Sequence, residues 1–489
     1  MARFNKPSST VTRTTNLAGG PAFVESPKLE LISVLLTSFL QDKYYRSSKE
    51  EIQRIRDLIA AEKDKLWVAK AAIYARNEHG MRSISHLVGA EIAHQVKGER
   101  WTRKFFDKLA RRPDDITEML ALYGTKYGKP FPNAMRDGFG MALARFDGYQ
   151  LAKYKSDGKA VSLVDAINIC HPRGSEYCGM LVKGTLPSAN TWETKLTKAG
   201  EDESLNALSG TEREEKLQEL KTDAWRKLVL SGKIGYFALL RNLRNILASN
   251  DEDLITSASE LLTDKRLIKR SLVMPFRFLS AIEEVEKLQN VHARTVLRAL
   301  SVALDYSMDS VPKFEGKTLV ALDDSGSMAG RTFAIGAIFA IALMKSSNAL
   351  LCMFSDRARF ITLNPDDSTL GLVQRINTQF RGHGTNMPAV FEVATQPFDR
   401  IVILSDMQTW MAGNFYGLRD ANSAFERYKI THKCNPRVYS FDLQGYGQLS
   451  FPEPNVFCLA GWSEKTFDVM RHLETDRNAM IRAIDNVVI

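Results

Sequence analysis

Apolar residues recur at spacings of three and four from residue 28 to about residue 310, which is the period of an amphipathic α-helix. The segments 29–40, 50–62, 65–77 and 83–96 carry this pattern, and 235–247 carries it farther along the chain. No segment of this region shows the period of two that is typical of a half-buried strand. A long series of helices with short connections predicts a solenoid of helical pairs, in which each pair buries an apolar face against the next.

The pattern changes near residue 312, where short apolar runs of strand length begin to alternate with helical patterns. The expected strands are 317–323, 349–354, 400–406, 437–443 and 455–461. This alternation predicts a doubly wound, Rossmann-like α/β domain with a mostly parallel sheet, whose ligand sites lie at the carboxyl ends of the strands. We therefore expect an N-terminal arm over 1–27, a helical domain over 28–311 and an α/β domain over 312–489.

The net charge of +9 is unevenly distributed along the chain. Residues 1–175 contain 29 Lys and Arg against 19 Asp and Glu, whereas the charges of the remaining residues nearly balance. Clustered positive charge suits a polyanion such as RNA, and a solvated basic helical surface is the alternative explanation of the same excess.

We expect a cytoplasmic protein with no membrane span. The longest Ala- and Ile-rich run, 334–344, is shorter than the roughly 20 residues that a span needs. The N-terminus lacks the apolar core of a secretory signal. Five cysteines without a CxxC pair favour free thiols in a reducing compartment, and argue against a disulfide framework or structural zinc.

The stretch LVALDDSGSM, 319–328, ends an expected buried strand in oxygen donors. Its donors are Asp323, Ser325 and Ser327, while Thr385 lies in the loop GHGTNMP and Asp406 ends another expected strand. Loops after parallel strands meet at one edge of the sheet, so these side chains can form one site. Carboxylate and hydroxyl oxygens without His or Cys suit Mg²⁺, or alternatively Mn²⁺. The competing interpretation is that they are helix caps and turn residues.

Catalytic chemistry fits this cluster poorly. The sequence shows no Ser, His and Asp grouping around it and no Walker-type phosphate loop. Cys352 lies inside an apolar strand, where a buried and inert thiol is the default. We therefore expect a protein that is not an enzyme, with a site that holds a ligand.

The motifs DDSGSM and GTN, with the second strand-end Asp, resemble the metal-ion-dependent adhesion site of von Willebrand factor A domains. The stretches NLAGGPAF, MRSISHLVGAEIA, SLVDAINICHP and GYFALLRNLRNIL resemble the TROVE module of the Ro autoantigen ribonucleoproteins. That family joins a TROVE module to a von Willebrand factor A domain, and the resemblance covers nearly the whole chain. Its compact length resembles the bacterial or phage members.

The resemblance implies that HEAT-like helical pairs curl into a ring within one chain, so that a monomer is expected. It implies binding of small structured Y RNAs and of the single-stranded 3′ ends of misfolded noncoding RNAs. It also implies association with an exoribonuclease or an RNA-repair protein. In such a protein Asp323, Ser325, Ser327, Thr385 and Asp406 are the metal-ligating positions, directly or through water.

The resemblance also places His171 at a family position implicated in RNA contact, and a hydrogen bond at the helix end is its alternative role. Nearby cations are candidate phosphate contacts, although each one taken alone is better explained as a solvated surface charge. Arg241 and Arg244 share one face of an expected helix, and Phe237 marks another face of the same helix. Alternatively, Arg241 forms a buried pair with an acidic neighbour. The expected RNA-binding residues are Arg136, Arg145, Lys153, Lys155, His171, Arg173, Arg241 and Arg244.

Two functions from different classes follow. The favoured one is a non-enzymatic RNA-binding ring that acts as a scaffold in quality control of noncoding RNA or in the stress response. The alternative is a Mg²⁺-dependent protein-adhesion scaffold whose A domain binds an acidic partner peptide. Asp324 adds a third carboxylate to the motif, and it would discourage an acidic ligand if it faced the metal. A metal-dependent nuclease is the least favoured function.

Overall fold

The computed structural model describes most of the chain in two compact units. The sheet unit comprises Met1–Leu109, Val311–Asp367 and Gly371–Ile489, and the helical unit comprises Ala110–Ser310 and Ser368–Leu370. The described residues are 13–15, 21–24, 27–38, 47–154, 159–189, 192–232, 234–271, 273, 275–309, 311–408, 421–444, 448–449, 456–459, 465–474 and 479–489.

The sheet unit contains a six-stranded sheet in the order β5-β4-β3-β6-β7-β9. All neighbouring strands are parallel except β4 and β5, which pair antiparallel. The strands are β3 (Thr318–Asp323), β4 (Leu350–Phe354), β5 (Ala358–Ile361), β6 (Arg400–Ser405), β7 (Arg437–Asp442) and β9 (Val456–Leu459). The five expected strands are therefore present, and β5 is an edge strand that the apolar pattern did not predict.

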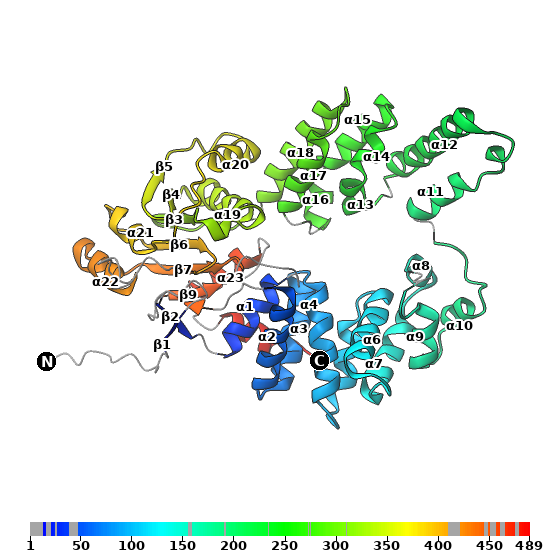
Figure 1. The fold of residues 1–489 in the computed structure, drawn as a ribbon, viewed down its shortest axis with the longest axis horizontal. Coiled ribbons are helices and arrows are strands. Elements are labelled where there is room, and N and C mark those ends of the chain that lie inside the picture. Colours follow the sequence, from blue (N-terminus) through cyan, green and yellow to red (C-terminus); the bar gives the residue numbers. More distant parts are fainter. Residues whose placement is uncertain are drawn as a thin grey trace. The chain divides into compact units, whose positions relative to one another are not determined.

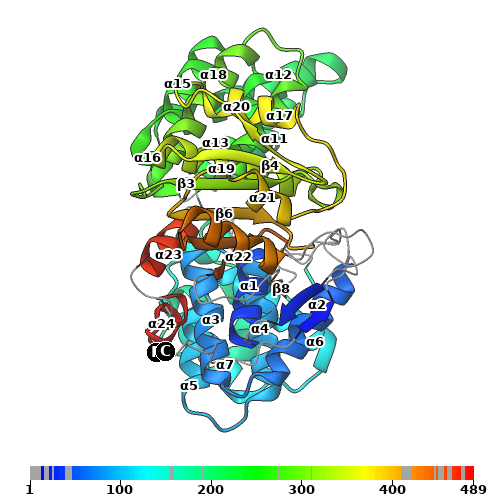
Figure 2. The same cartoon turned by 90° about the vertical axis from the view of Figure 1, so that its left-hand side faces the viewer.

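Helices cover both faces of this sheet (Figure 1). Residues of α21 (Pro388–Val393) and α22 (Ala421–His432) share an apolar cluster with one face, and Figure 2 looks onto that face. On the opposite face, α19 (Arg331–Ser347) and α23 (Lys465–Leu473) meet the sheet where Phe339 contacts Phe441. This arrangement is the doubly wound α/β fold expected from the sequence. The short helix α20 (Thr369–Asn377) follows β5.

Five N-terminal helices pack in the same unit as the sheet. They are α1 (Pro27–Thr37), α2 (Ser48–Ala61), α3 (Lys65–Glu78), α4 (Arg82–Gln95) and α5 (Trp101–Leu109). The last helix, α24 (Ala479–Asp485), packs against α3, where the Lys70 ammonium donates to the carbonyl of Asp485 at 2.5 Å. A small antiparallel sheet joins β1 (Arg13–Thr15), β2 (Pro21–Val24) and β8 (Gln448–Leu449).

The helical unit is a series of short helices that pack against near neighbours in the sequence, as a helical repeat requires (Figure 1). The first are α6 (Pro113–Tyr127), α7 (Asn133–Arg145), α8 (Gly148–Lys153), α9 (Leu163–Cys170), α10 (Glu176–Val182) and α11 (Trp192–Gly200). After a 3₁₀ turn (Glu203–Leu205) come α12 (Gly210–Leu230), α13 (Tyr236–Arg241), α14 (Leu243–Leu247), α15 (Glu252–Leu262), α16 (Lys265–Ser271), α17 (Phe276–Glu286) and α18 (Ala293–Met308). Among the described residues, no helix is long and apolar enough to cross a membrane.

The segment 235–247, expected as one helix, forms two helices that break at Asn242. The Asn242 side chain is buried and donates from Nδ2 to the carbonyl of Ala238 at 2.8 Å, and its Oδ1 accepts from Asn245. This side chain competes with the backbone ladder, which is the physical reason that the helix ends there. Arg241 is the last residue of α13 and Arg244 lies in α14, and both side chains are exposed.

Candidate functional site

The acidic ends of β3 and β6 lie side by side in the sheet. β3 and β6 are parallel neighbours, with Leu322 opposite Leu404. From β3 the chain first proceeds to β4 on one side, and β6 is then added on the other side. This reversal is the topological switch point at which open α/β sheets bind ligands. It brings Asp323, the last residue of β3, close to Asp406, which follows β6.

Hydrogen bonds fix the orientation of the Asp323 carboxylate, which is fully buried. Its Oδ1 accepts from the backbone N–H of Ser325 at 2.9 Å, and its Oδ2 accepts from the Ser405 hydroxyl at 2.5 Å. The hydroxyls of Ser325 and Ser327 are 3.4 Å apart and both side chains are buried. Three of the five expected ligands, Asp323, Ser325 and Ser327, are therefore linked by hydrogen bonds along one turn.

The loop 382–388 is tied to this turn through its backbone. The N–H of Gly326 donates to the carbonyl of His383 at 3.0 Å, and the N–H of Gly382 donates to the carbonyl of Asp324 at 2.9 Å. At the other end of the loop, Asn386 donates to the carbonyl of Ser355 at 2.7 Å. Thr385, which is buried, is thereby held at the same edge of the sheet as the serines.

One carboxylate oxygen of Asp406 is the strongest indication that this cluster binds a cation. Its Oδ1 accepts from the N–H of Gln408 at 3.2 Å, whereas its buried Oδ2 has no hydrogen-bond partner among the described residues. The turn after Asp406 is strained, because Met407 adopts a left-handed conformation with φ 58°. A buried carboxylate oxygen without a donor is costly unless something positive approaches it.

Both carboxyl groups are perturbed. Burial, with only partial compensation by hydrogen bonds, raises the pKa of Asp323 to about 6. Burial and the charge of Asp323 raise the pKa of Asp406 to about 8. The two acids resist being ionised at the same time, and a divalent cation would stabilise both charges. Three buried hydroxyls and one unpaired carboxylate oxygen lie in the same cluster, and such a cation takes oxygen ligands of this kind. The residues present therefore fit such an ion.

Asp324 does not join these groups, because its carboxylate pairs with Arg359 of β5. The distance from Nη2 to Oδ2 is 2.7 Å, and Asp324 is fully buried. Arg359 offsets the negative charge that this residue adds to the motif, and the remaining effect of that charge helps to raise the pKa of Asp323.

Sequence reasoning missed two polar side chains of this site. Ser405 holds Asp323, and Asp442, at the end of β7, is buried and its charge helps to raise the pKa of Asp406. The signal for Asp442 was present, because the run RVYSFD ends in a carboxylate as the runs of Asp323 and Asp406 do. Nothing in the sequence indicated a role for Ser405 except its position directly before Asp406.

Four of the residues expected to bind RNA lie on α7, α8 and the turn after α9, and α7 and α10 both pack against α9. His171 ends α9 in the left-handed conformation, with φ 47°, and its exposed ring has no described hydrogen-bond partner. Arg173 follows it and is exposed without a described ion pair. Arg136 lies close enough to Cys170 for its charge to act on that thiol, although burial dominates and raises the pKa of Cys170 to about 12.

Lys153 is exposed at the end of α8, with its Nζ 5.8 Å from the ring centroid of Tyr149 and 5.5 Å from that of Tyr154. Half of the Tyr149 surface is exposed, at 50%, so an aromatic face lies beside the lysine. Tyr177 of α10 adds a second exposed ring next to Gly148. We call Arg136, Lys153, His171 and Arg173 with these two tyrosines the α7–α10 surface.

Glycine at position 140 makes the close packing beneath this surface possible. A Cβ at Gly140 of α7 would lie 2.7 Å from the carbonyl oxygen of Cys170 and 3.8 Å from the Cα of Pro172. Only glycine lets α7 approach the end of α9 so closely. The position of His171 therefore depends on Gly140.

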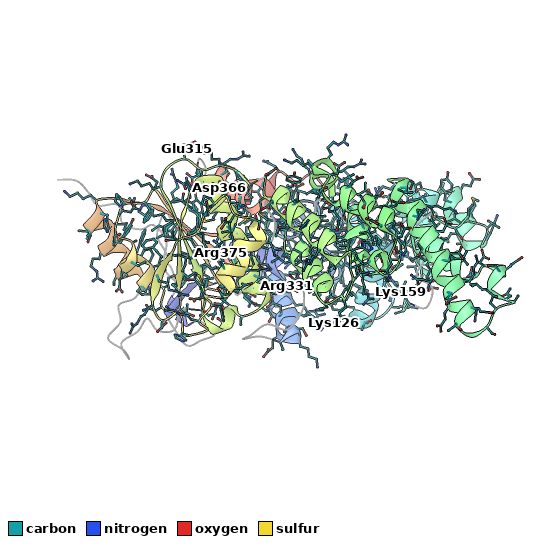
Figure 3. All side chains as sticks on the ribbon, turned by 90° about the horizontal axis from the view of Figure 1, so that it is seen from above. Lys126, Lys159, Glu315, Arg331, Asp366 and Arg375 are labelled. Carbon is teal, nitrogen blue, oxygen red and sulfur yellow. The ribbon has the colours of Figure 1, made fainter. Side chains whose placement is uncertain are left out.

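The remaining expected contacts are placed elsewhere. Arg145 donates to the carbonyl of Ala110, which gives it a structural role. Arg241 and Arg244 are exposed on α13 and α14, in a different group of helices. Lys155 lies outside the described residues. The exposed lysines Lys126 and Lys159, labelled in Figure 3, belong to the same unit as the α7–α10 surface.

Fold and sites together define a helical-repeat protein that carries a doubly wound α/β domain with a buried, oxygen-lined cluster. The family model of the TROVE domain matches residues 38–183 and 174–321, which is more than half of the chain. The chain therefore belongs to the TROVE domain family.

Relatives and a solved structure agree with this assignment. The RNA-binding protein RO60 of Deinococcus radiodurans is 26% identical over 300 residues, covering 53% of this chain and 56% of that protein. Telomerase protein component 1 of Rattus norvegicus is 23% identical over 300 residues, covering 46% of this chain and 11% of that protein. The chain thus spans from about a tenth to just over half of the length of these relatives. The crystal structure of the Deinococcus radiodurans Ro (Rsr) protein shares the fold, with a TM-score of 0.57 and 19% identity over 95% of this chain and 100% of that one.

Proposed function

We propose that this chain is a non-enzymatic RNA-binding protein and that the α7–α10 surface is its main RNA contact. The observation that carries the proposal is that α8 and α9 both pack against α10, and that Lys153, His171 and Arg173 on or just after these helices are exposed and without described ion pairs. Tyr149 of α8 and Tyr177 of α10 add exposed rings. Unpaired cations bind phosphates and release counterions, and neighbouring rings stack on unpaired bases. The name of the relative RNA-binding protein RO60 supports the same function.

We extend the proposal to the RNA class and the cellular role. The bound RNAs are small structured RNAs of the Y type and the single-stranded ends of misfolded or aberrant noncoding RNA. The protein acts in the cytoplasm as a single-chain ring that scaffolds RNA quality control or a stress response, with an exoribonuclease or RNA-repair protein as partner. The basic excess of residues 1–175, 29 Lys and Arg against 19 Asp and Glu, supports a polyanionic ligand.

We also propose that the sheet domain is a von Willebrand factor A domain that binds Mg²⁺, or Mn²⁺ in its place. Asp323, Ser325, Ser327, Thr385 and Asp406 hold the ion directly or through water. The unsatisfied Oδ2 of Asp406 and the raised pKa values of both acids support this assignment.

The RNA proposal is tested by titrating a labelled RNA stem-loop with the full chain and with Lys153→Glu and Arg173→Glu. Each reversal is expected to weaken binding and to reduce the slope of log affinity against log salt by about one, because one phosphate contact is lost. The matched control is Arg298→Glu, which reverses an exposed charge on α18 of the same unit. Binding that is insensitive to salt, or equal losses in all three variants, would contradict the proposal.

A protein-adhesion scaffold is the second candidate, and the unsatisfied Oδ2 of Asp406 favours it, because a bound cation with an open position can accept a carboxylate from a partner. Asp323→Ala separates the two functions. Adhesion is the function if three results are found together. Asp323→Ala abolishes the capture of protein partners, Lys153→Glu still captures them, and the wild type binds RNA negligibly. RNA that stays intact during incubation with the protein and Mg²⁺ excludes a nuclease.

A further inference from the structure

Phe237 is an exposed aromatic ring with two arginines close to it. It is 42% exposed on α13, although the apolar pattern of 235–247 suggested a packed position. The guanidinium carbon of Arg241, one turn later, lies 5.8 Å from the centroid of this ring. The guanidinium carbon of Arg277, on α17, lies 5.9 Å from the same centroid. We call Phe237, Arg241 and Arg277 the α13–α17 clamp.

The two arginines of the clamp have no described acidic partner. Neither forms an ion pair among the described residues of the chain. Burial, and then the charge of Arg241, lowers the pKa of Arg277. Two like charges around one ring oppose each other, and an anion that approaches both relieves that repulsion.

The platform under the clamp is firmly anchored. Tyr236, the residue before Phe237, is buried and donates its hydroxyl to the carbonyl of Leu262 at 2.7 Å. At the other end of α13, the buried Asn242 side chain fixes the helix terminus directly after Arg241. Phe237 and Arg241 are therefore presented on the outer face of a helix whose two ends are held by buried hydrogen bonds.

The surroundings add positive charge. Helix α16, KRLIKRS, packs against α13 and carries Lys269 and Arg270 in its last turn, both exposed and without a described ion pair. This local concentration of cations occurs in a stretch, 176–315, whose total charge is close to neutral.

We infer that the α13–α17 clamp binds one unpaired nucleotide, with the base stacked on Phe237 and the flanking phosphates held by Arg241 and Arg277. The exposed part of the Phe237 ring can stack with any nucleobase, and guanidinium groups bind phosphate in two-pronged fashion. A base within a duplex is already stacked on both sides, so the clamp selects single-stranded RNA. This inference rests on the proposed RNA-binding function and adds to it a second site, on helices other than α7–α10.

The test measures the affinity of the full chain for a labelled single-stranded uridine oligonucleotide of about twelve residues. Phe237→Leu keeps an apolar side chain but removes the π-face, and it is expected to weaken binding about five-fold or more. Phe237→Tyr keeps the π-face and is expected to bind as the wild type does. Arg277→Gln is expected to weaken binding, whereas Arg298→Gln, the matched loss of an exposed arginine on α18, is not.

A second measurement locates the base. An oligonucleotide carrying one 5-iodouridine is crosslinked by light, and the modified residue is identified by mass spectrometry. A crosslink at Phe237 supports the clamp. Suppose that the wild type binds both the stem-loop and the oligonucleotide. If Phe237→Leu then binds the oligonucleotide equally well and no crosslink maps to α13, the clamp is wrong and the proposed function stands. If the wild type binds neither RNA, both are wrong.

Discussion

Arg359 and Asp324 form a salt bridge next to the candidate metal ligands, with 2.7 Å between Nη2 and Oδ2 and 3.5 Å between Nη1 and Oδ1. Only 18% of the Arg359 side chain is exposed, and the Asp324 side chain is fully buried. The same Nη2 donates to the carbonyl of Gln379 at 2.6 Å. Arg359 therefore connects the edge strand β5, the turn after β3 and the chain that leads into the loop 382–388.

Removing Arg359 should destabilise the sheet unit strongly. Arg359→Met leaves a buried carboxylate without its partner, and the expected loss is about 3 kcal/mol in the free energy of unfolding. Urea denaturation, followed by fluorescence, measures this loss. The control is Arg375→Met, which removes an exposed arginine paired with Asp367 at 2.7 Å and should cost less than about 1 kcal/mol. Equal losses in the two variants would show that the burial of Asp324 is not what makes the pair important.

Stability should depend on pH and on Mg²⁺ together. The pKa values of Asp323 and Asp406 are raised in the folded state, to about 6 and about 8. The folded protein thus binds these protons more tightly than the unfolded chain, so the stability they provide at low pH is lost as pH rises through those values. Mg²⁺ replaces the protons, and it should raise the melting temperature more at about pH 8 than at about pH 5.

Thermal unfolding in EDTA and in Mg²⁺ at the two pH values measures this coupling. Asp406→Asn removes one of the two charges, so it should flatten the pH dependence without metal and abolish the effect of Mg²⁺. A rise in melting temperature that is the same at both pH values, or that persists in Asp406→Asn, would rule out a cation at this cluster.

The sheet and its candidate ligands were predictable because each depends on a short stretch of sequence. A buried parallel strand is a continuous apolar run, and a carboxylate directly after it marks the edge at which loops meet. Asp323 and Asp406 satisfied both conditions, so the sequence alone located them.

Features that depend on distant partners were not predictable in this way. β5 has two partly buried residues followed by one exposed and one buried residue, so it shows no alternating pattern, and its identity as a strand rests on pairing with β4. The role of Asp324 rests on Arg359, which lies 35 residues away in sequence. Phe237 carried an apolar signal, yet it is exposed because the core beneath α13 is filled by Tyr236, Leu239 and Leu240. Tertiary packing decided each of these cases.

Alanine at position 140 should disturb the α7–α10 surface. Its Cβ would lie 2.7 Å from the carbonyl of Cys170, so α7 and the end of α9 must separate. We expect Gly140→Ala to cost about 1–3 kcal/mol of stability and to weaken RNA binding, because His171 is displaced. The control is Gly179→Ala on α10, where a Cβ meets nothing within 4 Å, and which should gain up to about 1 kcal/mol. Thermal unfolding and RNA titration of both variants test this packing, and an unchanged Gly140→Ala protein would contradict it.

Replacing His171 by glycine should separate stability from RNA binding. The residue has φ 47° at the end of α9, a left-handed conformation that glycine adopts without strain. We therefore expect His171→Gly to keep or raise the melting temperature while it weakens binding of the RNA stem-loop, since the exposed ring is lost. Lys433→Gly is the matched control, because Lys433 is also exposed and left-handed, with φ 49°, but lies in the sheet unit. Both variants should be at least as stable as the wild type, and only His171→Gly should lose affinity. A stable His171→Gly protein with full affinity would show that the ring makes no RNA contact, and the α7–α10 surface would then rest on its cations and tyrosines.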